Sequence, residues 1–600
     1  MEQLWSISTT IREAERITGF LKTASEINGE KWDSQTQAKF QILLVKNRQY
    51  LNDPDNSQIY GRLNEEQCEL LRNKALSMTY EQAEGIINAK NYEGGPAMRG
   101  RQSMSPLYKL GLVYIVDGRV HVTDMGQKLI NGEISFGDFM LDALLKFQYP
   151  NPYENSYQTW NTKPFINALR LIKSVNGLCE SKNIPAKGIT KTEFGIFVLS
   201  LKNHADVDKT AEDVLNFRQK YNSFKTEDGQ ENFRVEFVNE YLSDFKNPAK
   251  NTAEYADNMI RYMRLTKYIR IRGKYSHVYI DLEPGRLTEI NSILEADDGS
   301  AAQYSKEEWR NYMGIYGAYP LPFETVEKLE EILSKIDEDI NAIENKLGIT
   351  PSFSEKCSDR EEYKAEIERR RLKRTELQNL EIKQEYHDSV QKIDEAIKAL
   401  EDIRDRNRAS LAKKYSIELE KWVNVALNII NDSILIKPNA PVGDDNEPTY
   451  TAPSGVADIE CFYEKFNAIC EVTMLTSRDQ WFNEGQPVMR HLRDFEKRNP
   501  KQSYCLFIAP RLHQDTVNTF YNSVKYEYEG EKQKIIPMTI TQLIDILQAI
   551  KLMIKGKRKF VHSELMKLYD TCVDMGKVAN SQVWLAHIQN SLAEWTQKIK

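Results

Sequence analysis

The sequence predicts a multidomain α+β protein with a mainly helical N-terminal half, a helical linker and a compact C-terminal α/β domain. Three observations lead to this fold class. A helix followed by a tight hairpin occurs twice in the first 300 residues, coiled-coil spacing follows, and strands then alternate with helices. A chain of 600 residues is long enough for several domains of about 150 residues each.

The first helix-plus-hairpin pattern lies in "SPLYKLGLVYIVDGRVHVTDMGQKLI", residues 105–130. Two alternating strands are expected at Leu112–Val116 and Arg119–Thr123. They are joined by Asp117-Gly118, a dipeptide typical of two-residue hairpin turns. This order predicts a winged-helix-like unit. The polar residues just ahead of it are Arg99, Arg101 and Gln102.

The second pattern lies in residues 252–282, where strands are expected at Tyr268–Ile271 and Val278–Asp281 with a turn around Gly273. Positive charge is concentrated here in Arg261, Arg264, Arg270, Arg272 and Lys274. Because base edges and phosphates are contacted mainly by such side chains, two units of this kind favour a DNA-reading half. The alternative is that each unit is a packing or protein–protein module.

Apolar residues then follow the 4-3-4 spacing of a coiled-coil seam. The first run is Leu329, Leu333, Ile336, Ile340, Ile343 and Leu347, and the second is Tyr386, Val390, Ile393, Ile397 and Leu400. Gly348 and Pro351 interrupt the pattern, and a highly charged stretch precedes the second run. We expect an antiparallel helical hairpin or small bundle that acts as a spacer.

Past residue 414 the pattern is that of a small mixed sheet flanked by helices. A helix is expected over residues 416–432, and strands over 503–510 and 534–540. The expected division of the chain is therefore 1–150, 151–320, 321–412 and 413–600.

Composition restricts the class of protein. The net charge of −7 means that any nucleic-acid surface must be a local basic patch. The seven cysteines show no CxxC spacing, which argues against zinc ribbons and fits a reducing cytosol. No apolar run reaches the roughly 18 residues of a membrane span, and the N-terminus lacks a signal-peptide core. We expect a cytoplasmic protein without membrane partners.

Two carboxylates occur where a buried sheet would favour apolar residues. Asp458 opens a strand in "GVADIECFYEKFNAICEVTMLTS", and twelve residues separate it from Glu471 on the next strand. A hairpin of that length brings both carboxylates to one sheet edge. Carboxylates so placed can hold a divalent ion that activates water for phosphodiester hydrolysis, which indicates a metal-dependent nuclease. The alternatives are a turn aspartate and a strand-edge ion pair.

The helix that follows adds further candidates. Pro487 is typical of a first helical turn. If the helix extends back to Glu484, that residue shares a face with His491, seven positions later. Glu484 could complete the metal shell or hold its water, and Arg490 or His491 could hold a phosphate or leaving oxygen. The alternative for His491 is a surface histidine.

Several stretches together resemble the AlwI family of type IIS restriction endonucleases. They include "LWSISTTIREAERITGFL", "LLKFQYPNP", "EGQPVMRHL" and "YCLFIAP", besides the hairpin and carboxylate stretches quoted above. Enzymes in or close to this family include strand-nicking endonucleases. The resemblance implies two DNA-recognition subdomains over 1–150 and 151–320 and a helical linker over 321–412. It further implies a PD-(D/E)xK cleavage domain over 413–600 that uses Mg²⁺.

Position by position, the resemblance makes Asp458 the metal-binding acid, Glu471 the second acid and Glu484 the helix acid, followed by His491. A further acid on the preceding helix is Glu418 or Glu420, because the match there is ambiguous by a residue or so.

The chain departs from the motif at two positions. Ala457 stands where the motif has proline, and Thr473 stands where it has lysine and carries no charge. Related enzymes share the threonine form. Arg490, His491 or a nearby lysine is then expected to orient the water.

The leading expectation is a type IIS endonuclease of the bacterial cytoplasm that cuts double-stranded DNA a few nucleotides from a short asymmetric site. The alternatives are a nicking endonuclease or the large subunit of a heterodimeric restriction enzyme, and a non-catalytic DNA-binding regulator with a degenerate nuclease domain. Expected partners besides DNA are a second copy joined through the cleavage domain, or a small second subunit. A companion DNA methyltransferase is expected in the host.

Overall fold

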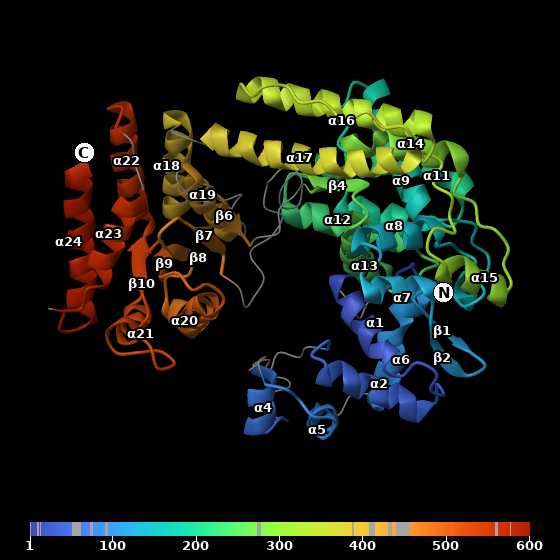
Figure 1. Cartoon of the computed structure of the whole chain (residues 1–600), viewed down its shortest axis with the longest axis horizontal. Coiled ribbons are helices and arrows are strands. Elements are labelled where there is room, and N and C mark those ends of the chain that lie inside the picture. Colours follow the sequence, from blue (N-terminus) through green and yellow to red (C-terminus); the bar gives the residue numbers. More distant parts are fainter. Residues whose placement is uncertain are drawn as a thin grey trace. The chain divides into compact units, whose positions relative to one another are not determined.

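The computed structural model shows a mostly helical α+β protein with small sheets, the largest a five-stranded mixed sheet near the C-terminus (Figure 1). It describes all residues except 1, 9–10, 12–13, 51–61, 73–75, 91–93, 273–277, 387–388, 407–414, 430–434, 440–456, 559–561, 577 and 600. The chain forms two compact units. Unit 1 comprises Met1–Ile271, Val278–Lys335 and Cys357–Lys364, and unit 2 comprises Arg272–His277, Ile336–Lys356 and Ala365–Lys600.

The sheet of unit 2 has the strand order β10-β9-β8-β7-β6 (Figure 1). Its strands are β6 (Leu435–Pro438), β7 (Ile459–Phe462), β8 (Asn467–Val472), β9 (Ser503–Ala509) and β10 (Ile535–Thr539). Strands β8, β9 and β10 are parallel, whereas β6 and β7 pair antiparallel. Every residue of β9 is buried, as expected for an interior strand of a sheet covered on both faces.

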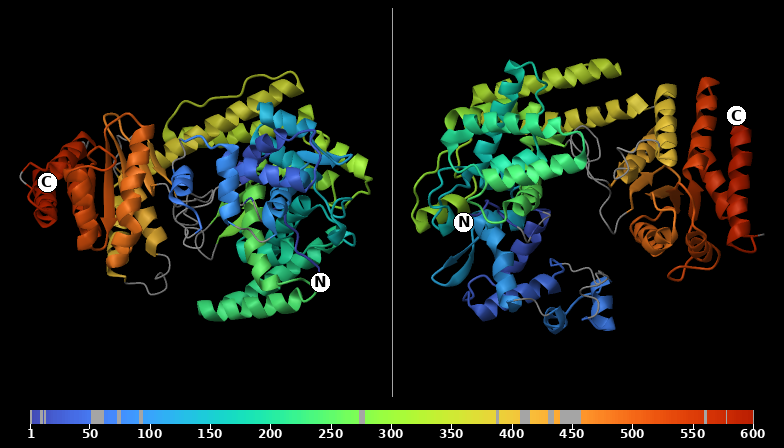
Figure 2. Two further views of the ribbon diagram at one scale, coloured as in Figure 1. Left: turned by 90° about the horizontal axis from the view of Figure 1, so that it is seen from below. Right: turned by 180° about the vertical axis from the view of Figure 1, so that it is seen from behind.

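Seven helices of the described part of unit 2 accompany this sheet. They are α18 (Val390–Asp405), α19 (Tyr415–Ile429), α20 (Arg478–Arg498), α21 (Gln514–Lys525), α22 (Ile540–Lys555), α23 (His562–Val573) and α24 (Ser581–Ile599). Figure 2 shows the C-terminal helices (red) and the strands (orange) from two further directions. A capping box of Thr539 and Gln542 begins α22 directly after β10, so the sequence turns from strand to helix within one residue.

The expected coiled-coil spacing has a different meaning in each half of the linker. Ile393, Ile397 and Leu400 of α18 belong to the hydrophobic core that also contains α19 and α22. Their spacing therefore reflects packing within unit 2 and not a coiled-coil seam. The expectation that the apolar runs of residues 329–347 and 386–400 form one helical hairpin was wrong.

The helical hairpin is instead formed by α16 (Val326–Leu347) and α17 (Arg360–Tyr386), the latter built from the charged stretch (Figure 1). Ion pairs join the two helices where apolar residues are few. Arg370 is fully buried and donates to Asp337 over 2.6 Å, and Arg374 pairs with Asp339 at 3.0 Å. Periodicity of apolar residues could not reveal α17, because its contacts are largely polar.

Unit 1 is built mainly from helices. Its described helices before residue 200 are η1 (Ala14–Arg16), α1 (Ile17–Ser25), α2 (Ser34–Lys46), α4 (Glu65–Arg72), α5 (Tyr80–Lys90), α6 (Gly95–Lys109), α7 (Asp124–Asn131), α8 (Phe136–Lys146), η2 (Asn155–Tyr157), α9 (Pro164–Ser181), α10 (Lys191–Glu193) and η3 (Phe194–Val198). Those that follow are η4 (His204–Asp206), α11 (Val207–Ser223), α12 (Glu227–Tyr241), α13 (Pro248–Arg264), η6 (Pro284–Arg286), α14 (Leu287–Ala296) and α15 (Lys306–Gly314).

The first expected hairpin is present to within one residue. Strands β1 (Val113–Val116) and β2 (Arg119–Val122) pair antiparallel between α6 and α7. Asp117 and Gly118 both have positive φ, 50° and 72°, which is the backbone that a two-residue turn of this kind requires. The Asp-Gly signal therefore located the turn correctly.

The second expected hairpin is also present, with an additional strand. β4 (Ile269–Arg272) lies beside β5 (Tyr279–Leu282), and β5 pairs on its other side with β3 (Ile189–Thr190). The connecting turn with Gly273 and Lys274 lies outside the described residues. The third strand comes from 80 to 90 residues earlier in the chain, so a local pattern could not indicate it.

The burial of Lys90 in unit 1 predicts that the stability gained by removing its charge depends on pH. Its side chain is 5% exposed, and its Nζ has no hydrogen-bond partner among the described residues. Burial lowers the pKa of Lys90 from 10.5 to about 8, so the folded state disfavours the charged form. We expect Lys90→Met to raise the thermal unfolding midpoint below pH 8, with the gain shrinking as the pH rises from about 8 to 10.5. If calorimetry shows the same rise in unfolding midpoint across this pH range, the lowered pKa of Lys90 is contradicted.

Within the described residues, no helix combines the length and the apolar character needed to cross a membrane.

Candidate active site

The two predicted carboxylates face one another across the β7–β8 pair of unit 2. The antiparallel register places Ile459 opposite Cys470. Continued by one residue, it places Asp458, at the entry to β7, opposite Glu471 near the end of β8. Directly opposed residues in such a pair project on the same face of the sheet, so the two carboxylates are neighbours.

Asp458 is held by the backbone of the opposite strand. Its Oδ2 accepts a hydrogen bond from the Val472 N–H over 2.7 Å. Burial raises the pKa of Asp458 well above its usual range, and repulsion from Glu471 and then Glu484 adds to the effect, whereas the Val472 bond opposes it. An ionised Asp458 is therefore costly in this structure without a cation beside it.

Glu471 lies deeper in the same cluster, with only 5% of its surface exposed. Its Oε1 is 2.8 Å from Nδ1 of His491. Burial raises the pKa of Glu471 well above its usual range, and the carboxylates of Glu484 and Glu420 raise it further. Acidic side chains from β7, β8, α19 and α20 thus repel one another within one buried region.

Helix α20 supplies the third acid and the histidine. It begins at Arg478, where the Ser477 side chain accepts from the Asp479 N–H. Pro487 therefore lies inside the helix and not in its first turn, which corrects the expectation from sequence. Because the cap lies so early, the helix does extend back to Glu484, and Glu484 and His491 share a face.

Glu484 is linked to the strand residue that replaces the motif lysine. The Thr473 hydroxyl donates a hydrogen bond to Glu484, and Thr473 is itself 6% exposed. Burial raises the pKa of Glu484, while this hydrogen bond and the nearby His491 lower it. Thr473 thus orients an acid at the position where the motif has a cation.

His491 is neutral near pH 7, because burial, assisted by the positive charge of Arg490, lowers its pKa from 6.5 to about 4. When Glu471 is ionised, as it would be beside a cation, the neutral ring carries its proton on Nδ1 and donates it to Oε1, 2.8 Å away. Its Nε2 is buried and has no hydrogen-bond partner among the residues that the structure describes. The nitrogen that would accept a proton is therefore unoccupied.

Helix α19 distinguishes between the two acids that sequence reasoning left open. Glu420 is 5% exposed and is close enough to Glu471 to raise its pKa. Glu418 is instead bound by the Trp422 indole, whose Nε1 donates to its Oε2 over 3.0 Å. Residues two apart project to different sides of a helix, and Glu420 is the one of the two whose charge acts on Glu471.

Arg490 is exposed, in contrast to the groups around it, and makes no ion pair with any residue in the described part of the chain. It influences His491 through charge alone. Its position on α20 leaves it open to an anion from outside.

The carboxylate cluster has the ligand chemistry of a divalent-cation site. No group of three or more His, Cys, Asp or Glu side chains among the described residues is arranged to hold a metal ion in the present rotamers. Asp458 is bound to Val472 and Glu471 to His491 instead. Mg²⁺ usually keeps several waters and takes only one or two carboxylates, so an Asp458–Glu471 pair with raised pKa values fits its chemistry.

The DNA-binding candidates of the first hairpin lie on α6 in unit 1. Arg101 and Gln102 are exposed, and Nη1 of Arg101 donates to Oε1 of Gln37 on α2 over 2.8 Å. Arg99 lies 3.3 Å from the Gln102 amide oxygen. The sequence did not indicate Gln37 as a partner of Arg101, because the two residues are 64 positions apart and no local pattern links them.

The candidates near the second hairpin are partly neutralised. Arg261 pairs with Asp257 at 3.1 Å, and Arg270 lies 3.7 Å from Asp281. Arg264 ends α13 and Arg272 ends β4, whereas Lys274 lies outside the described residues.

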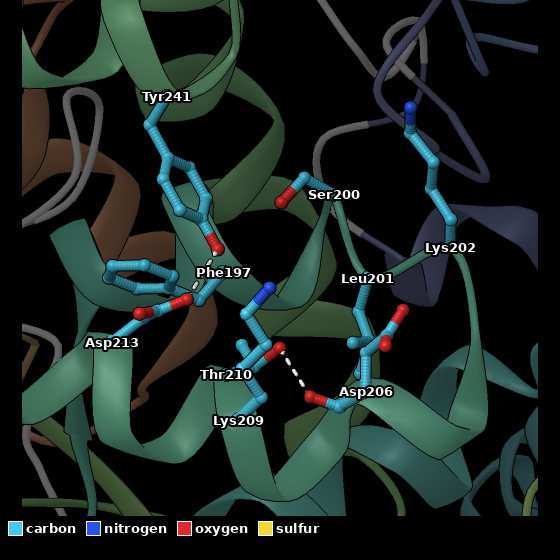
Figure 3. A pocket seen from close by; sticks show the side chains of 9 residues that line it. All are labelled: Phe197, Ser200, Leu201, Lys202, Asp206, Lys209, Thr210, Asp213 and Tyr241. Atoms are coloured by element: carbon cyan, nitrogen blue, oxygen red, sulfur yellow. Dashed lines mark hydrogen bonds between the residues drawn. The ribbon is translucent and has the colours of Figure 1, made fainter.

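A separate polar pocket of about 210 Å³ occurs in unit 1 (Figure 3). It is lined by Phe197, Ser200, Leu201, Lys202, Asp206, Lys209, Thr210, Asp213 and Tyr241. Within it the Tyr241 hydroxyl donates to Asp213 over 3.2 Å, and the Thr210 hydroxyl donates to the Asp206 carbonyl over 2.7 Å (Figure 3). None of the predicted catalytic residues lines it, so it is not part of the carboxylate cluster.

Most of the chain matches a known protein family. The pattern of the AlwI restriction endonuclease family matches residues 108–546, which include both hairpins and the whole carboxylate cluster. This chain belongs to the AlwI restriction endonuclease family. Membership of this AlwI family implies a DNA phosphodiester hydrolase. No curated protein sequence matches the chain closely enough to add a nearer relative.

Three solved structures resemble parts of this AlwI-family chain. The small subunit of the heterodimeric restriction endonuclease R.BspD6I is 18% identical, covers 34% of this chain and 97% of its own, and has a TM-score of 0.27. The DNA-bound binding domain of the BpuJ1 endonuclease is 13% identical over 50% of this chain and 91% of its own, with a TM-score of 0.30. The restriction endonuclease FokI is 11% identical over 89% of this chain and 97% of its own, with a TM-score of 0.21.

Proposed function

We propose that this chain is a type IIS restriction endonuclease whose unit 2 hydrolyses DNA phosphodiester bonds with Mg²⁺. The observation that carries the proposal is the buried carboxylate cluster, in which Asp458 lies opposite Glu471 and is joined by Glu484. Carboxylates with raised pKa values that have no lysine or arginine partner among the described residues are typical of a site that functions with a metal cation.

Asp458 and Glu471 would hold the cation, with Glu484 beside them. Such a cation would polarise a phosphoryl oxygen and lower the pKa of a bound water. Thr473 holds Glu484 by a hydrogen bond, and His491 donates to Glu471. The unpartnered Nε2 of His491 would accept a hydrogen bond from water, and thus take over the orienting role of the motif lysine.

Glu420, and not Glu418, is the acid of α19 that we propose acts on the cleavage site. We expect Glu420→Gln to lower the cleavage rate by about 10-fold or more, because it removes a charge that acts on Glu471, an effect of the size seen for groups that support metal ligands. Glu418→Gln should leave the rate within about 3-fold, since its amide can still accept from Trp422. Equal losses in single-turnover cleavage by both variants would contradict this assignment.

Sequence recognition is assigned to unit 1. Both helix-plus-hairpin units resemble winged helices, which suits them to grooves and backbone phosphates. Arg101 of α6 is the strongest candidate, because it is exposed and its hydrogen-bond partner, Gln37, is a neutral amide.

A nicking activity is the second candidate function. The described residues contain one such carboxylate cluster, and one cleavage centre hydrolyses one strand at a time. Cleavage of both strands would then require a second copy of the chain or a small second subunit. The third alternative, a DNA-binding regulator, predicts no cleavage at all.

The test is incubation of the purified chain with plasmid DNA in Mg²⁺ and in EDTA, with sequencing of the product ends on each strand. Ends on both strands at a fixed distance from one short asymmetric sequence support the type IIS proposal. Ends on one strand only would favour the nicking enzyme. Intact plasmid in Mg²⁺, although a gel shift shows binding, would overturn the proposed cleavage.

A further inference from the structure

Helices α2 and α6 of unit 1 approach so closely that their relative register is fixed. A Cβ atom at Gly100 would lie 1.9 Å from the backbone oxygen of Gln37, a distance that no side chain can occupy. Gly100 is therefore required for the two backbones to touch at this point. The next residue on α6, Arg101, is thereby held at a fixed height beside Gln37.

The contact between the helices is polar at this end. Oε1 of Gln37 accepts from Nη1 of Arg101 over 2.8 Å, and one turn farther along α2 Oε1 of Gln41 accepts from the Ser103 hydroxyl over 2.9 Å. Gln37 is 8% exposed, and its Nε2 donates to the Trp32 carbonyl over 3.3 Å. That second bond orients the Gln37 amide so that its oxygen faces Arg101.

Arg101 keeps its full positive charge in this arrangement, because its partner is a neutral amide. Its remaining N–H groups, on Nε and Nη2, have no acceptor among the described residues. Arg261 and Arg270, by contrast, each lie beside an aspartate. Arg101 is thus an exposed guanidinium that is held on one side and open on the other.

We infer that Arg101 is a specificity-determining residue that reads a guanine in the major groove, and that Gln37 is the positioning residue that presents it. This inference rests on the proposed endonuclease function. Guanine offers two adjacent acceptors, O6 and N7, on its major-groove edge. The planar fork of an arginine donates to both at once, and a fork already fixed by Gln37 loses less freedom on binding.

A phosphate contact is the competing role for Arg101, and the two roles differ in measurable ways. A base contact discriminates between sequences and depends on the N7 atom of one guanine. A phosphate contact weakens binding to all sequences alike when it is lost and reduces the salt dependence of binding.

The test measures binding of the whole protein to duplexes that carry its cleavage site, in Ca²⁺ so that binding is observed without turnover. Each guanine of the site is replaced in turn by 7-deazaguanine, which lacks the N7 acceptor. We expect one such replacement to weaken wild-type binding by about 5- to 150-fold. Arg101→Ala should bind the natural site correspondingly more weakly and be insensitive to that same replacement.

Three further variants and one control variant test whether Gln37 positions the Arg101 guanidinium. Arg101→Lys keeps the charge but loses the fork, and should also lose the sensitivity to 7-deazaguanine. Gln37→Leu removes the acceptor and should reduce that sensitivity, whereas Gln41→Leu removes only the acceptor of Ser103 and should retain it. Arg360→Ala, at an exposed arginine of α17 that pairs with Glu361, is the matched control and should bind as the wild type does.

Uniform weakening by Arg101→Ala on cognate and unrelated duplexes, with a salt slope reduced by about 1, would overturn the inference and assign Arg101 to a phosphate. Retained 7-deazaguanine sensitivity in Arg101→Lys or Arg101→Ala would overturn it as well. If the wild type binds every duplex equally, the proposed restriction function itself fails. Equal binding by the wild type can be told from failure of the Arg101 inference, because it is seen before any variant is made.

Discussion

Replacing Asp458 by asparagine is expected to reduce DNA cleavage by about 10³-fold or more while leaving site-specific DNA binding intact. A bound divalent cation supplies several kcal/mol of transition-state stabilisation, and each 1.36 kcal/mol corresponds to about 10-fold in rate. Asparagine is nearly isosteric and can still accept from the Val472 N–H, so the β7–β8 edge should be preserved. Single-turnover cleavage and gel-shift measurements on the same duplex give the two quantities.

The same variant should be more stable than the wild type when no metal is present. The pKa of Asp458 is raised by burial and by Glu471, so its ionised form destabilises the folded state at neutral pH. Removing the charge removes that penalty. This combination of lost activity and gained stability is not expected from a residue with a merely structural role.

Glu460→Gln is the matched control, because Glu460 is a buried acid on the same strand. It differs in being paired with cations, Arg498 at 3.1 Å and Lys437 at 3.4 Å. Its loss should lower stability and leave the cleavage rate within about 3-fold. If Asp458→Asn cleaves as fast as Glu460→Gln, the carboxylate cluster is not the cleavage centre.

The largest effect on stability is expected at Lys146 in unit 1. Its side chain is fully buried, pairs with Asp142 at 2.6 Å, and donates to the carbonyls of Met313 and Ile315 over 3.0 and 2.9 Å. Burial lowers the pKa of Lys146 and raises that of Asp142, and their mutual attraction opposes both shifts. Lys146→Ala removes the cation beside a buried carboxylate, which keeps only the Gly317 N–H, and the donor to two carbonyls, which should lower the free energy of unfolding by about 3–5 kcal/mol.

An exposed pair with the same spacing serves as the control. Lys128 and Asp124 are also four residues apart and 3.0 Å from one another, but their side chains are 36% and 48% exposed. Lys128→Ala should therefore change the free energy of unfolding by about 0.5 kcal/mol or less. Chemical denaturation, followed by circular dichroism, measures both variants. Similar losses in the two would contradict the view that burial makes the Lys146 pair important.

Local signals in the sequence located much of the fold. The Asp117-Gly118 turn was predicted correctly because only a few dipeptides tolerate two positive φ angles in succession. The strands of unit 2 around residues 503–509 and 535–539 were found because a buried strand is a short continuous apolar run. Such signals depend on residues within a few positions of one another.

Features that depend on distant residues were missed or misassigned. The charged helix α17 is explained by its partners on α16, and the apolar spacing of α18 by the core that it joins in unit 2. Strand β3 belongs to a sheet whose other strands lie 80 residues later. None of these partners is visible in a local window.

In the candidate site, too, features set by neighbouring residues were predicted, and features set by distant residues were not. The hairpin spacing correctly suggested that Asp458 and Glu471 are neighbours. The start of α20 was misplaced because Pro487 was taken as a helix start, whereas Ser477 caps the helix ten residues earlier. The distinction between Glu418 and Glu420 required the helix orientation, and Gln37 required the packing of α2 on α6. Their roles stay predictions until the variants are made.

The central claim, that these carboxylates hold a divalent cation for DNA cleavage, is tested most directly by Mn²⁺ binding. Paramagnetic resonance reports free Mn²⁺ as it is titrated into the protein on a duplex whose scissile phosphate carries a non-cleavable phosphorothioate. We expect the wild type and Glu460→Gln to bind Mn²⁺, and Asp458→Asn to lose that binding. Equal uptake by all three proteins would contradict it, because the cation would then be bound elsewhere.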